Sequence, residues 1–208
     1  MAAVVSEADL KASAAGRRMG AKSSETRSFL LDSAETIMRE EGYAAVTSRQ
    51  LAKAAQMSPQ IVYYYFRTMD DLFEALFLRF AEVLHAALEE AAQHDEPILA
   101  MWKLSSDPSR ATIVTEFLAL ANHRKGIAAV IAQFGVRYQA RQAEIIAETL
   151  DRRGIKLAGW TPQRLATVLE NLARSFLLGA NFDMPGHHDT HAFVTEWLAQ
   201  TLSGKPDA

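Results

Sequence analysis

The sequence predicts an all-α protein, with a small N-terminal domain of three helices and a larger helical C-terminal domain. Three observations support this fold class. Only 6 Pro and 10 Gly occur among 208 residues, and 49% of the chain is hydrophobic, which is enough for a buried core. Apolar residues recur at spacings of three and four in successive segments, which predicts about nine helices. No segment shows the apolar–polar alternation of a half-buried strand.

The N-terminal part of the chain is expected to contain an arm followed by a helix. Residues 1–24 are rich in Ala and Ser and lack periodicity, which predicts a flexible basic arm. The basic residues of this arm either contact phosphates or belong to a solvated tail. Helical spacing of apolar residues predicts a helix over residues 26–41, and Gly42 provides its stop signal.

Residues 47–66 form the most informative segment, because both of its expected helices carry start signals. Thr47 is a good N-cap residue, and Gln50 three positions later completes a capping-box sequence. Ser58 is expected to cap a second short helix, which has Pro59 at its first position. Two short helices joined by a tight turn predict a helix-turn-helix, whose second helix reads the DNA major groove.

The second of these helices is expected to have a core face and a DNA face. Val62 and Phe66 are four residues apart and form the core-facing stripe. Gln60, Ile61 and Tyr64 fall on the other side. Gln can pair with an adenine, Ile can contact a thymine methyl group, and a Tyr hydroxyl can donate to a phosphate.

The small domain is expected over residues 25–70 and the larger domain over residues 71–208. Thr68 is expected to cap a long helix that runs to about residue 92. Breaks rich in Pro, Gly or Ser separate the helices that follow. These are expected over residues 98–104, 109–122, 126–152, 162–180 and 189–202, with Thr161 as the cap of the helix over 162–180.

Residues 26 to 77 resemble the N-terminal DNA-binding domain of TetR-type transcriptional regulators. The residues that carry the resemblance are Gly42-Tyr43, Thr47, Leu51-Ala52, Ser58, the run Tyr63 to Phe66, and Asp70 with Leu72. The resemblance implies a helical ligand-binding and dimerisation domain in the rest of the chain. It also implies a homodimeric repressor that binds a palindromic double-stranded DNA operator and is released by a small apolar or amphipathic effector.

The resemblance also assigns expected roles to individual residues of the helix-turn-helix. The positions that face bases are Ser48, Arg49, Pro59, Gln60, Ile61 and Tyr64. The positions that face phosphates are Thr47, Ser58, Tyr63 and Tyr65. The alternative for Tyr63 and Tyr65 is that their side chains belong in part to the core.

Two residues depart from the family pattern. The family often has Gly in the turn where this chain has Gln56, and a non-glycine residue with positive φ is strained. The family usually has Lys where Met69 stands, so this chain lacks one cation that would contact a phosphate.

In the larger domain, apolar and aromatic residues at helical spacing are candidates for a ligand pocket or for an interface. The expected pocket lining is Met101, Trp102, Phe117, Phe134, Tyr138, Asn171 and Phe176, although aromatic residues at this spacing are equally typical of a core. The last two helices are expected to pair across a two-fold axis. The expected dimer interface comprises Leu165, Leu169, Leu172, Phe176, Val194, Trp197 and Leu198, although these stripes could also serve only the core of one chain.

Composition narrows the function classes. The net charge of −3 does not by itself indicate a nucleic-acid binder, but residues 1–68 carry nine Lys or Arg against seven Asp or Glu, so the positive charge is N-terminal. There is no Cys and no recognisable catalytic or nucleotide-binding motif, so we expect neither an enzyme nor a cofactor. The sequence HHDTH at 187–191 is interpreted as an exposed polar helix start rather than a metal site.

No apolar run is long enough to span a membrane and no secretion signal is evident, so a cytoplasmic protein without membrane contact is expected. Two rival functions remain open. One is a constitutive dimeric DNA-binding protein without a ligand. The other is an all-helical protein that only binds a small molecule.

Overall fold

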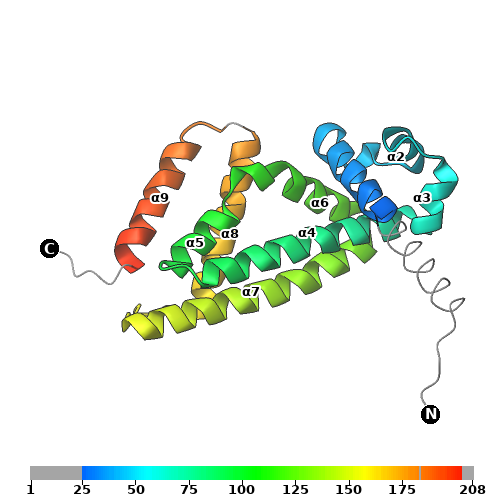
Figure 1. Cartoon of the computed structure of the whole chain (residues 1–208). Helices are drawn as coiled ribbons and strands as arrows, with labels where there is room; N and C mark the ends of the chain where they lie inside the picture. Colours follow the sequence, from blue (N-terminus) through cyan, green and yellow to red (C-terminus); the bar gives the residue numbers. More distant parts are fainter. Residues whose placement is uncertain (1–24, 183, 203–208) are drawn as a thin grey trace, which may run out of the picture. The chain divides into compact units, whose positions relative to one another are not determined.

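The computed structural model describes residues 25–182 and 184–202, and all regular structure in these ranges is helical (Figure 1). The all-α prediction is therefore confirmed. The chain divides into two compact units, Met1–Leu76 and Phe77–Ala208, so the division falls a few residues after the expected boundary at residue 70. The expected basic arm, residues 1–24, lies outside the described residues. None of the helices within these ranges has the length and apolar character needed to cross a membrane.

The N-terminal unit is built from short helices around a small apolar core. A helix over residues 25–41 is followed by η1 (Tyr43–Ala45), α2 (Ser48–Ala54), α3 (Pro59–Tyr65) and the start of α4 (Met69–Ala92). Val62 and Phe66 are 0% and 3% exposed, so the predicted core face of α3 is confirmed. Gly42 ends the first helix with φ 85° and ψ 163°, a conformation that is accessible essentially only to glycine.

The helix starts agree with the sequence in position but only partly in hydrogen bonding. The Thr47 side chain accepts from the backbone N–H of Gln50 at 3.2 Å, as expected of an N-cap. The capping box does not close, because the Thr47 N–H donates to the carbonyl of Ala45 at 2.9 Å rather than to Gln50. The Gln50 amide nitrogen donates to the carboxylate of Glu41 at 3.2 Å. Ser58 makes no side-chain cap hydrogen bond, although α3 begins at Pro59 as predicted.

The turn between α2 and α3 keeps its hydrogen bonds although glycine is missing from it. Gln56 has φ 53°, and it is the one non-glycine residue with positive φ in the described part of the chain. The N–H of Met57 donates to the carbonyl of Ala52 at 2.8 Å, and the N–H of Gln56 donates to that of Lys53 at 3.2 Å. These two bonds form a Schellman motif, which normally places glycine at the left-handed position.

Replacing Gln56 with glycine is expected to stabilise the helix-turn-helix by about 0.5 to 1 kcal/mol. The gain comes from relief of the left-handed strain, reduced by the greater chain entropy of glycine in the unfolded state. Amide hydrogen exchange of α2 and α3 measures this opening free energy. Gln56→Ala is the control, because it keeps the Cβ and should give no gain. Equal exchange in wild-type protein and Gln56→Gly would contradict the account.

The C-terminal unit contains the rest of α4 and five further α-helices within the described ranges. These are α5 (Pro97–Ser105), α6 (Ala111–His123) preceded by η2 (Pro108–Arg110), α7 (Lys125–Arg153), α8 (Pro162–Asn181) and α9 (His187–Leu202). Each agrees with its predicted range to within a few residues. Thr161 caps α8 as predicted, because its side chain accepts from the backbone N–H of Arg164 at 3.2 Å.

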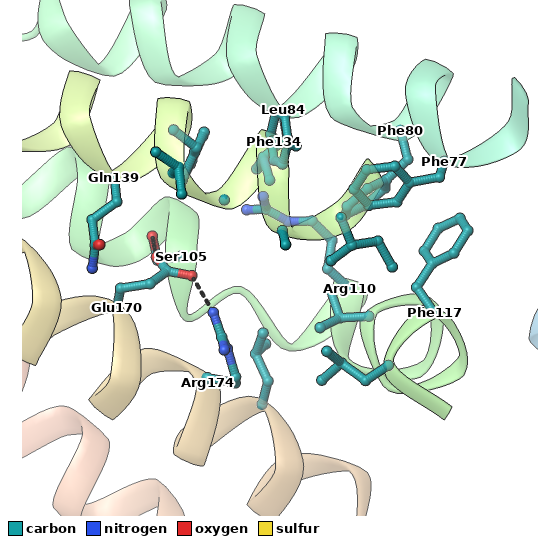
Figure 2. A pocket seen from close by; sticks show the side chains of 18 of the residues that line it. Phe77, Phe80, Leu84, Ser105, Arg110, Phe117, Phe134, Gln139, Glu170 and Arg174 are labelled. Carbon is teal, nitrogen blue, oxygen red and sulfur yellow. Dashed lines mark hydrogen bonds and ion pairs between the residues drawn. The ribbon is translucent and has the colours of Figure 1, made fainter. Parts of the chain in front are cut away.

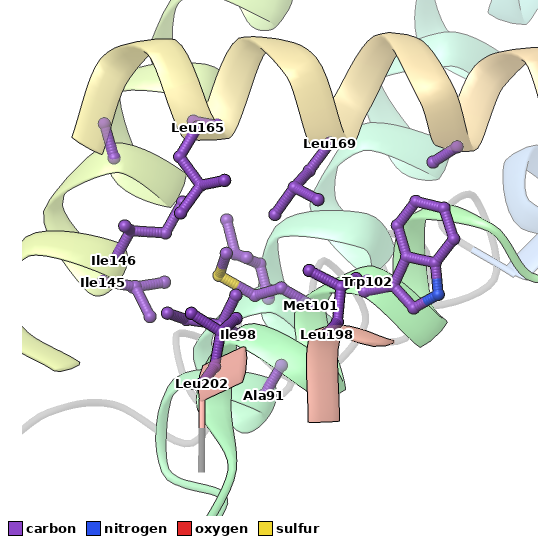
Figure 3. Close-up of a cluster of buried hydrophobic side chains, with 14 of the residues drawn as sticks. Ala91, Ile98, Met101, Trp102, Ile145, Ile146, Leu165, Leu169, Leu198 and Leu202 are labelled. Carbon is purple, nitrogen blue, oxygen red and sulfur yellow. The ribbon is translucent and has the colours of Figure 1, made fainter. Parts of the chain in front are cut away.

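The main core of this unit surrounds α5. Figure 3 shows side chains of α5 lying between those of α8 and α9. Its labelled residues are Ala91, Ile98, Met101, Trp102, Ile145, Ile146, Leu165, Leu169, Leu198 and Leu202, all of them buried. Trp102 is 1% exposed, and its indole N–H donates to the Thr195 hydroxyl at 2.8 Å, which ties α5 to α9.

Two histidines at the start of α9 face the protein rather than solvent. Nε2 of His187 lies 2.8 Å from the carbonyl of Phe176, and Nε2 of His191 lies 2.8 Å from the Ser106 hydroxyl. A Cβ at Gly179 would overlap the His187 ring, so glycine makes room for it. The interpretation of 187–191 as an exposed cap is therefore wrong for these two side chains. Within the described residues, no cluster of three or more His, Asp or Glu could hold a metal ion.

A bidentate ion pair fixes α4 against α7. The guanidinium of Arg141 donates to both carboxylate oxygens of Glu89, at 2.8 and 2.9 Å. This hydrogen bonding lowers the pKa of the Glu89 carboxyl below its ordinary value. The two helices run side by side in Figure 1, and the part of α4 beyond Leu76 therefore presents a fixed face to the interior of the C-terminal unit.

Candidate DNA-binding surface and ligand cavity

The outer face of α3 carries the residues that were expected to read bases. Tyr64 is 77% exposed and Ile61 is 38% exposed, while Pro59 and Gln60 are also exposed. Since Val62 on the opposite face is fully buried, the helix is anchored by one side and presents the other to solvent. Large exposed apolar groups on an anchored helix are typical of a surface that has a partner.

The remaining expected DNA-binding residues lie around this face. Thr47, Arg49 and Ser58 are exposed, and Ser48 is partly exposed. Tyr63 is 50% exposed, and its hydroxyl donates to the hydroxyl of Ser48 at 3.1 Å, which connects α3 to the start of α2.

The last tyrosine of the run is less accessible than its neighbours. Tyr65 is partly buried, and its ring packs edge-on against that of Tyr64 with centroids 5.0 Å apart. The alternative that these tyrosines belong in part to the core therefore holds for Tyr65 and not for Tyr63.

Exposed cations accompany these residues in the N-terminal unit. Arg49, Lys53 and Arg67 are exposed on or next to α2 and α3. Arg27 lies over the ring of Phe66, with its guanidinium carbon 5.2 Å from the ring centroid. Arg27 lies within the first helix, residues 25–41.

A cavity of about 420 Å³ lies within the C-terminal unit, and its two ends differ in chemistry. Four phenylalanines line one end: Phe77 and Phe80 from α4, Phe117 from α6 and Phe134 from α7. Figure 2 shows Phe77, Phe80 and Phe117 gathered on one side and Ser105, Glu170 and Arg174 on the other.

The other end of the cavity is polar and contains charged groups. Its lining includes Ser105, Arg110, Tyr138, Gln139, Glu170, Asn171 and Arg174. Arg174 and Glu170 form an ion pair across one turn of α8, with N and O 3.4 Å apart. A largely apolar cavity with a few convergent polar groups is typical of a small-molecule site.

Tyr138 lines the cavity but is itself almost fully buried. Its side chain is 4% exposed, and its hydroxyl has no hydrogen-bond partner among the described residues. Burial, with a smaller contribution from the nearby Glu170 carboxylate, raises the pKa of Tyr138 above its ordinary value. The phenol is therefore neutral at physiological pH.

Four of the expected ligand-binding residues line this cavity, and three do not. Phe117, Phe134, Tyr138 and Asn171 belong to the lining. Met101, Trp102 and Phe176 lie instead in the buried core cluster, where their side chains are 3%, 1% and 6% exposed. Their spacing identified an apolar face correctly but could not distinguish a filled core from a cavity wall.

Sequence reasoning missed the charged part of the lining. Arg110 lies in a short connection between helices, where no periodicity draws attention to it. Glu170 and Arg174 are four residues apart on α8, next to the predicted Asn171. Two opposite charges and an amide within five residues of α8 are a signal that could have marked this end of the cavity.

The exposed apolar face of α8 and α9 differs from the predicted interface. Four of the residues expected there are buried in the core of the same chain and cannot face a partner: Leu165, Leu169, Phe176 and Leu198. Leu172 and Val194 are partly exposed, and Trp197 is 50% exposed. The larger exposed apolar side chains on these helices and the turn between them are Val168, Leu178, Phe182, Met184, Phe193 and Trp197.

Comparison with known proteins agrees with a helix-turn-helix unit followed by a larger helical unit. Residues 30–76 match the sequence model of the family described as bacterial regulatory proteins, tetR family. A TetR transcription regulator from Haloarcula marismortui superposes with a TM-score of 0.72 at 16% identity, covering 85% of this chain and 97% of that one. No curated protein sequence matches the chain.

Two further solved structures show the same fold. GusR of Salmonella enterica has a TM-score of 0.70 at 18% identity, with 86% of this chain and 96% of that one covered. NemR of E. coli in its reduced form has a TM-score of 0.69 at 19% identity, with 82% and 96% covered.

The N-terminal domain, over residues 30–76, matches the TetR family of bacterial regulatory proteins. The chain as a whole has the fold of the TetR regulators of known structure.

Proposed function

We propose that the protein is a homodimeric transcriptional repressor that binds a palindromic DNA operator and is released by a small amphipathic ligand. The observation that carries the proposal is the face of α3 formed by Gln60, Ile61 and Tyr64, which is exposed on a domain of a DNA-binding family. The proposed role is binding rather than catalysis, needs no cofactor and is exercised in the cytoplasm.

In this proposal α3 enters the major groove and the surrounding residues hold the phosphates. Gln60 and Ile61 offer an amide and a methyl-rich surface to base edges. Tyr64 is more exposed than Ile61 and Tyr63, and the exposed Arg49 on α2 and Arg67 after α3 supply positive charge. These roles are supported by exposure and side-chain chemistry together.

Dimerisation is proposed through the exposed apolar face of α8 and α9. Val168 and Leu178 are exposed on α8 and Phe182 directly follows its last residue, while Phe193 and Trp197 are one turn apart on α9. A self-complementary apolar face is what a two-fold interface requires. Two reading helices related by such an axis match the two half-sites of a palindrome.

Ligand release is proposed to act through α4. This helix begins at Met69, soon after α3 ends at Tyr65, and its residues Phe77, Phe80 and Leu84 line the cavity. A ligand that binds one position of α4 better than another shifts the equilibrium between DNA-binding and released states.

The two rival functions account for less of the structure. A constitutive DNA-binding protein has no use for a cavity of about 420 Å³ with a polar end. A protein that only binds a small molecule has no use for a reading helix that exposes Ile61 and Tyr64.

DNA footprinting tests the proposal directly. The full-length protein should protect two half-sites, related by two-fold symmetry and about one helical turn apart, in the DNA upstream of its own gene. A single protected half-site would contradict the dimer, and no protection at low salt would contradict the DNA-binding role.

Replacing Met69 with lysine is expected to strengthen DNA binding and its salt dependence. The added cation would neutralise one more phosphate per protomer, so the slope of log K against log salt should steepen by about one for each protomer bound. Met69→Gln is the matched control, since it adds length and polarity without charge. An unchanged slope in Met69→Lys would place this position away from the DNA backbone.

A further inference from the structure

The apolar end of the cavity is built to receive a ring or a short hydrocarbon group. The Phe77 ring meets those of Phe117 and Phe134 nearly edge-on, with centroids 5.2 and 5.7 Å apart. Phe80 also packs on Phe117, at 5.6 Å. Connected aromatic walls of this kind favour aromatic and apolar guests. The volume of about 420 Å³ lies within the range of small-molecule pockets.

At the polar end, both carboxylate oxygens of Glu170 already accept hydrogen bonds from other side chains of the protein. One oxygen of Glu170 accepts from the Ser105 hydroxyl and from the Gln142 amide, both at 3.2 Å. The other oxygen accepts from Arg174 at 3.4 Å. A cationic ligand would therefore have to compete with three internal donors for this anion.

Hydrogen-bond donors, in contrast, are in excess at this end. Arg110 donates to the carbonyl of Leu104 and lies 3.5 Å from the carboxylate of Asp107. Arg174 makes its ion pair with Glu170 through one nitrogen. Each guanidinium carries five N–H donors, so both retain donors that a ligand can use.

The surplus of donors specifies the head group of the ligand. A carboxylate accepts two parallel hydrogen bonds from a guanidinium, and this pairing is roughly twice as strong as one between neutral groups. A second anionic group on the same ligand would lie among the phenylalanine rings, where nothing compensates its lost hydration. The site therefore suits one anionic head and one apolar body.

We propose that the effector is an apolar monocarboxylate, with its carboxylate at Arg174 and Arg110 and its hydrocarbon part among Phe77, Phe80, Phe117 and Phe134. This proposal rests on the proposed function only in treating the cavity as the effector site. Binding to the cavity and release of DNA are separate measurements, so either idea can fail alone.

Isothermal titration calorimetry on the full-length protein with three matched compounds tests the head group. Phenylbutanoate, phenylbutanol and phenylbutylamine share a body and differ in charge. Phenylbutanoate should bind at least about tenfold more tightly than phenylbutanol, since it gains charge-assisted hydrogen bonds, and phenylbutylamine should bind most weakly. Equal binding of the alcohol, or tighter binding of the amine, would overturn the proposal.

Butanoate, which lacks the ring, tests the apolar end of the cavity. It should bind far more weakly than phenylbutanoate, and equal binding of the two would show that the phenylalanine-lined end does not hold the ring.

Variants of Arg174 test whether the carboxylate of the ligand binds at this residue. Arg174 is nearly half exposed, so Arg174→Gln should fold normally and weaken phenylbutanoate binding by about tenfold while leaving phenylbutanol unchanged. Arg174→Lys should recover part of the loss. Arg152→Gln is the control, because it removes the same charge from an exposed position outside the cavity lining. If Arg174→Gln and Arg152→Gln weaken phenylbutanoate binding equally, the loss reflects only the change in net charge, and the assignment of the carboxylate to Arg174 is overturned.

The DNA assay separates this inference from the proposed function. If phenylbutanoate binds as expected but leaves the operator complex intact, the ligand class stands and the release mechanism fails. If the protein binds its operator but discriminates none of the three compounds, the repressor proposal stands and the monocarboxylate assignment fails.

Discussion

Replacing Tyr64 with alanine is expected to weaken specific operator binding strongly while leaving the protein folded. The side chain is 77% exposed, so its removal costs little core packing. A base or phosphate contact of this kind contributes about 1 to 3 kcal/mol. Because a dimer uses the residue twice, we expect a loss of about 2 to 6 kcal/mol, or at least about thirtyfold in affinity.

Fluorescence anisotropy at constant salt measures this loss, and circular dichroism verifies the fold. Phe29→Ala is a matched control, because Phe29 is 47% exposed in the same unit but lies on the first helix. Tyr64→Phe separates the hydroxyl from the ring. Operator affinity in Tyr64→Ala equal to that of the wild type would refute the assignment of α3 as the reading helix.

Replacing Trp197 with glutamate is expected to dissociate the dimer. Trp197 is 50% exposed on α9 beside Phe193, which is 68% exposed, so the carboxylate would enter the centre of the proposed apolar interface. An uncompensated charge is expensive in such a place, and two-fold symmetry introduces it twice. The dimer dissociation constant should rise by at least about a hundredfold, since truncation of a single central aromatic residue often costs 2 kcal/mol or more.

Sedimentation equilibrium of wild-type protein and Trp197→Glu measures the change directly. Val83→Glu is the control, because Val83 is 67% exposed on α4, outside α8 and α9. Operator affinity should fall together with dimerisation. A Trp197→Glu protein that stays dimeric would place the interface on another surface.

Local features of the fold were predictable from the sequence because their causes are local. Thr161 and Pro162 mark the start of α8 through cap geometry and a fixed φ, which depend on neighbouring residues only. The spacing of Val62 and Phe66 identifies the buried side of α3, and by exclusion the side that carries Tyr64. The positive φ of Gln56 was indicated instead by the resemblance to the TetR family, which often has Gly at this position of the turn.

The larger domain was less predictable, because helical spacing identifies the apolar face of a helix but does not show what that face packs against. Trp102 and Phe134 both lie on apolar helix faces, yet one fills the core and the other lines the cavity. Leu169 and Val168 are adjacent on α8, and only packing against α5 decides which of them is buried.

Polar partners also escaped prediction, since they depend on residues distant in the sequence. Gln50 was expected to cap its own helix but bonds to Glu41 instead. His191 reaches the Ser106 hydroxyl across 85 positions of the chain. The polar end of the cavity has the same origin, because Arg110 and Glu170 come together only in the folded unit.

The central claim is that this protein binds DNA through α3 as a dimer. The most direct test is a titration of the DNA upstream of its own gene with full-length protein at several salt concentrations. The account predicts two protomers per duplex and an affinity that falls steeply with salt, since each neutralised phosphate adds about 0.9 to the slope. Absence of binding at low salt, or binding that is insensitive to salt, would contradict it.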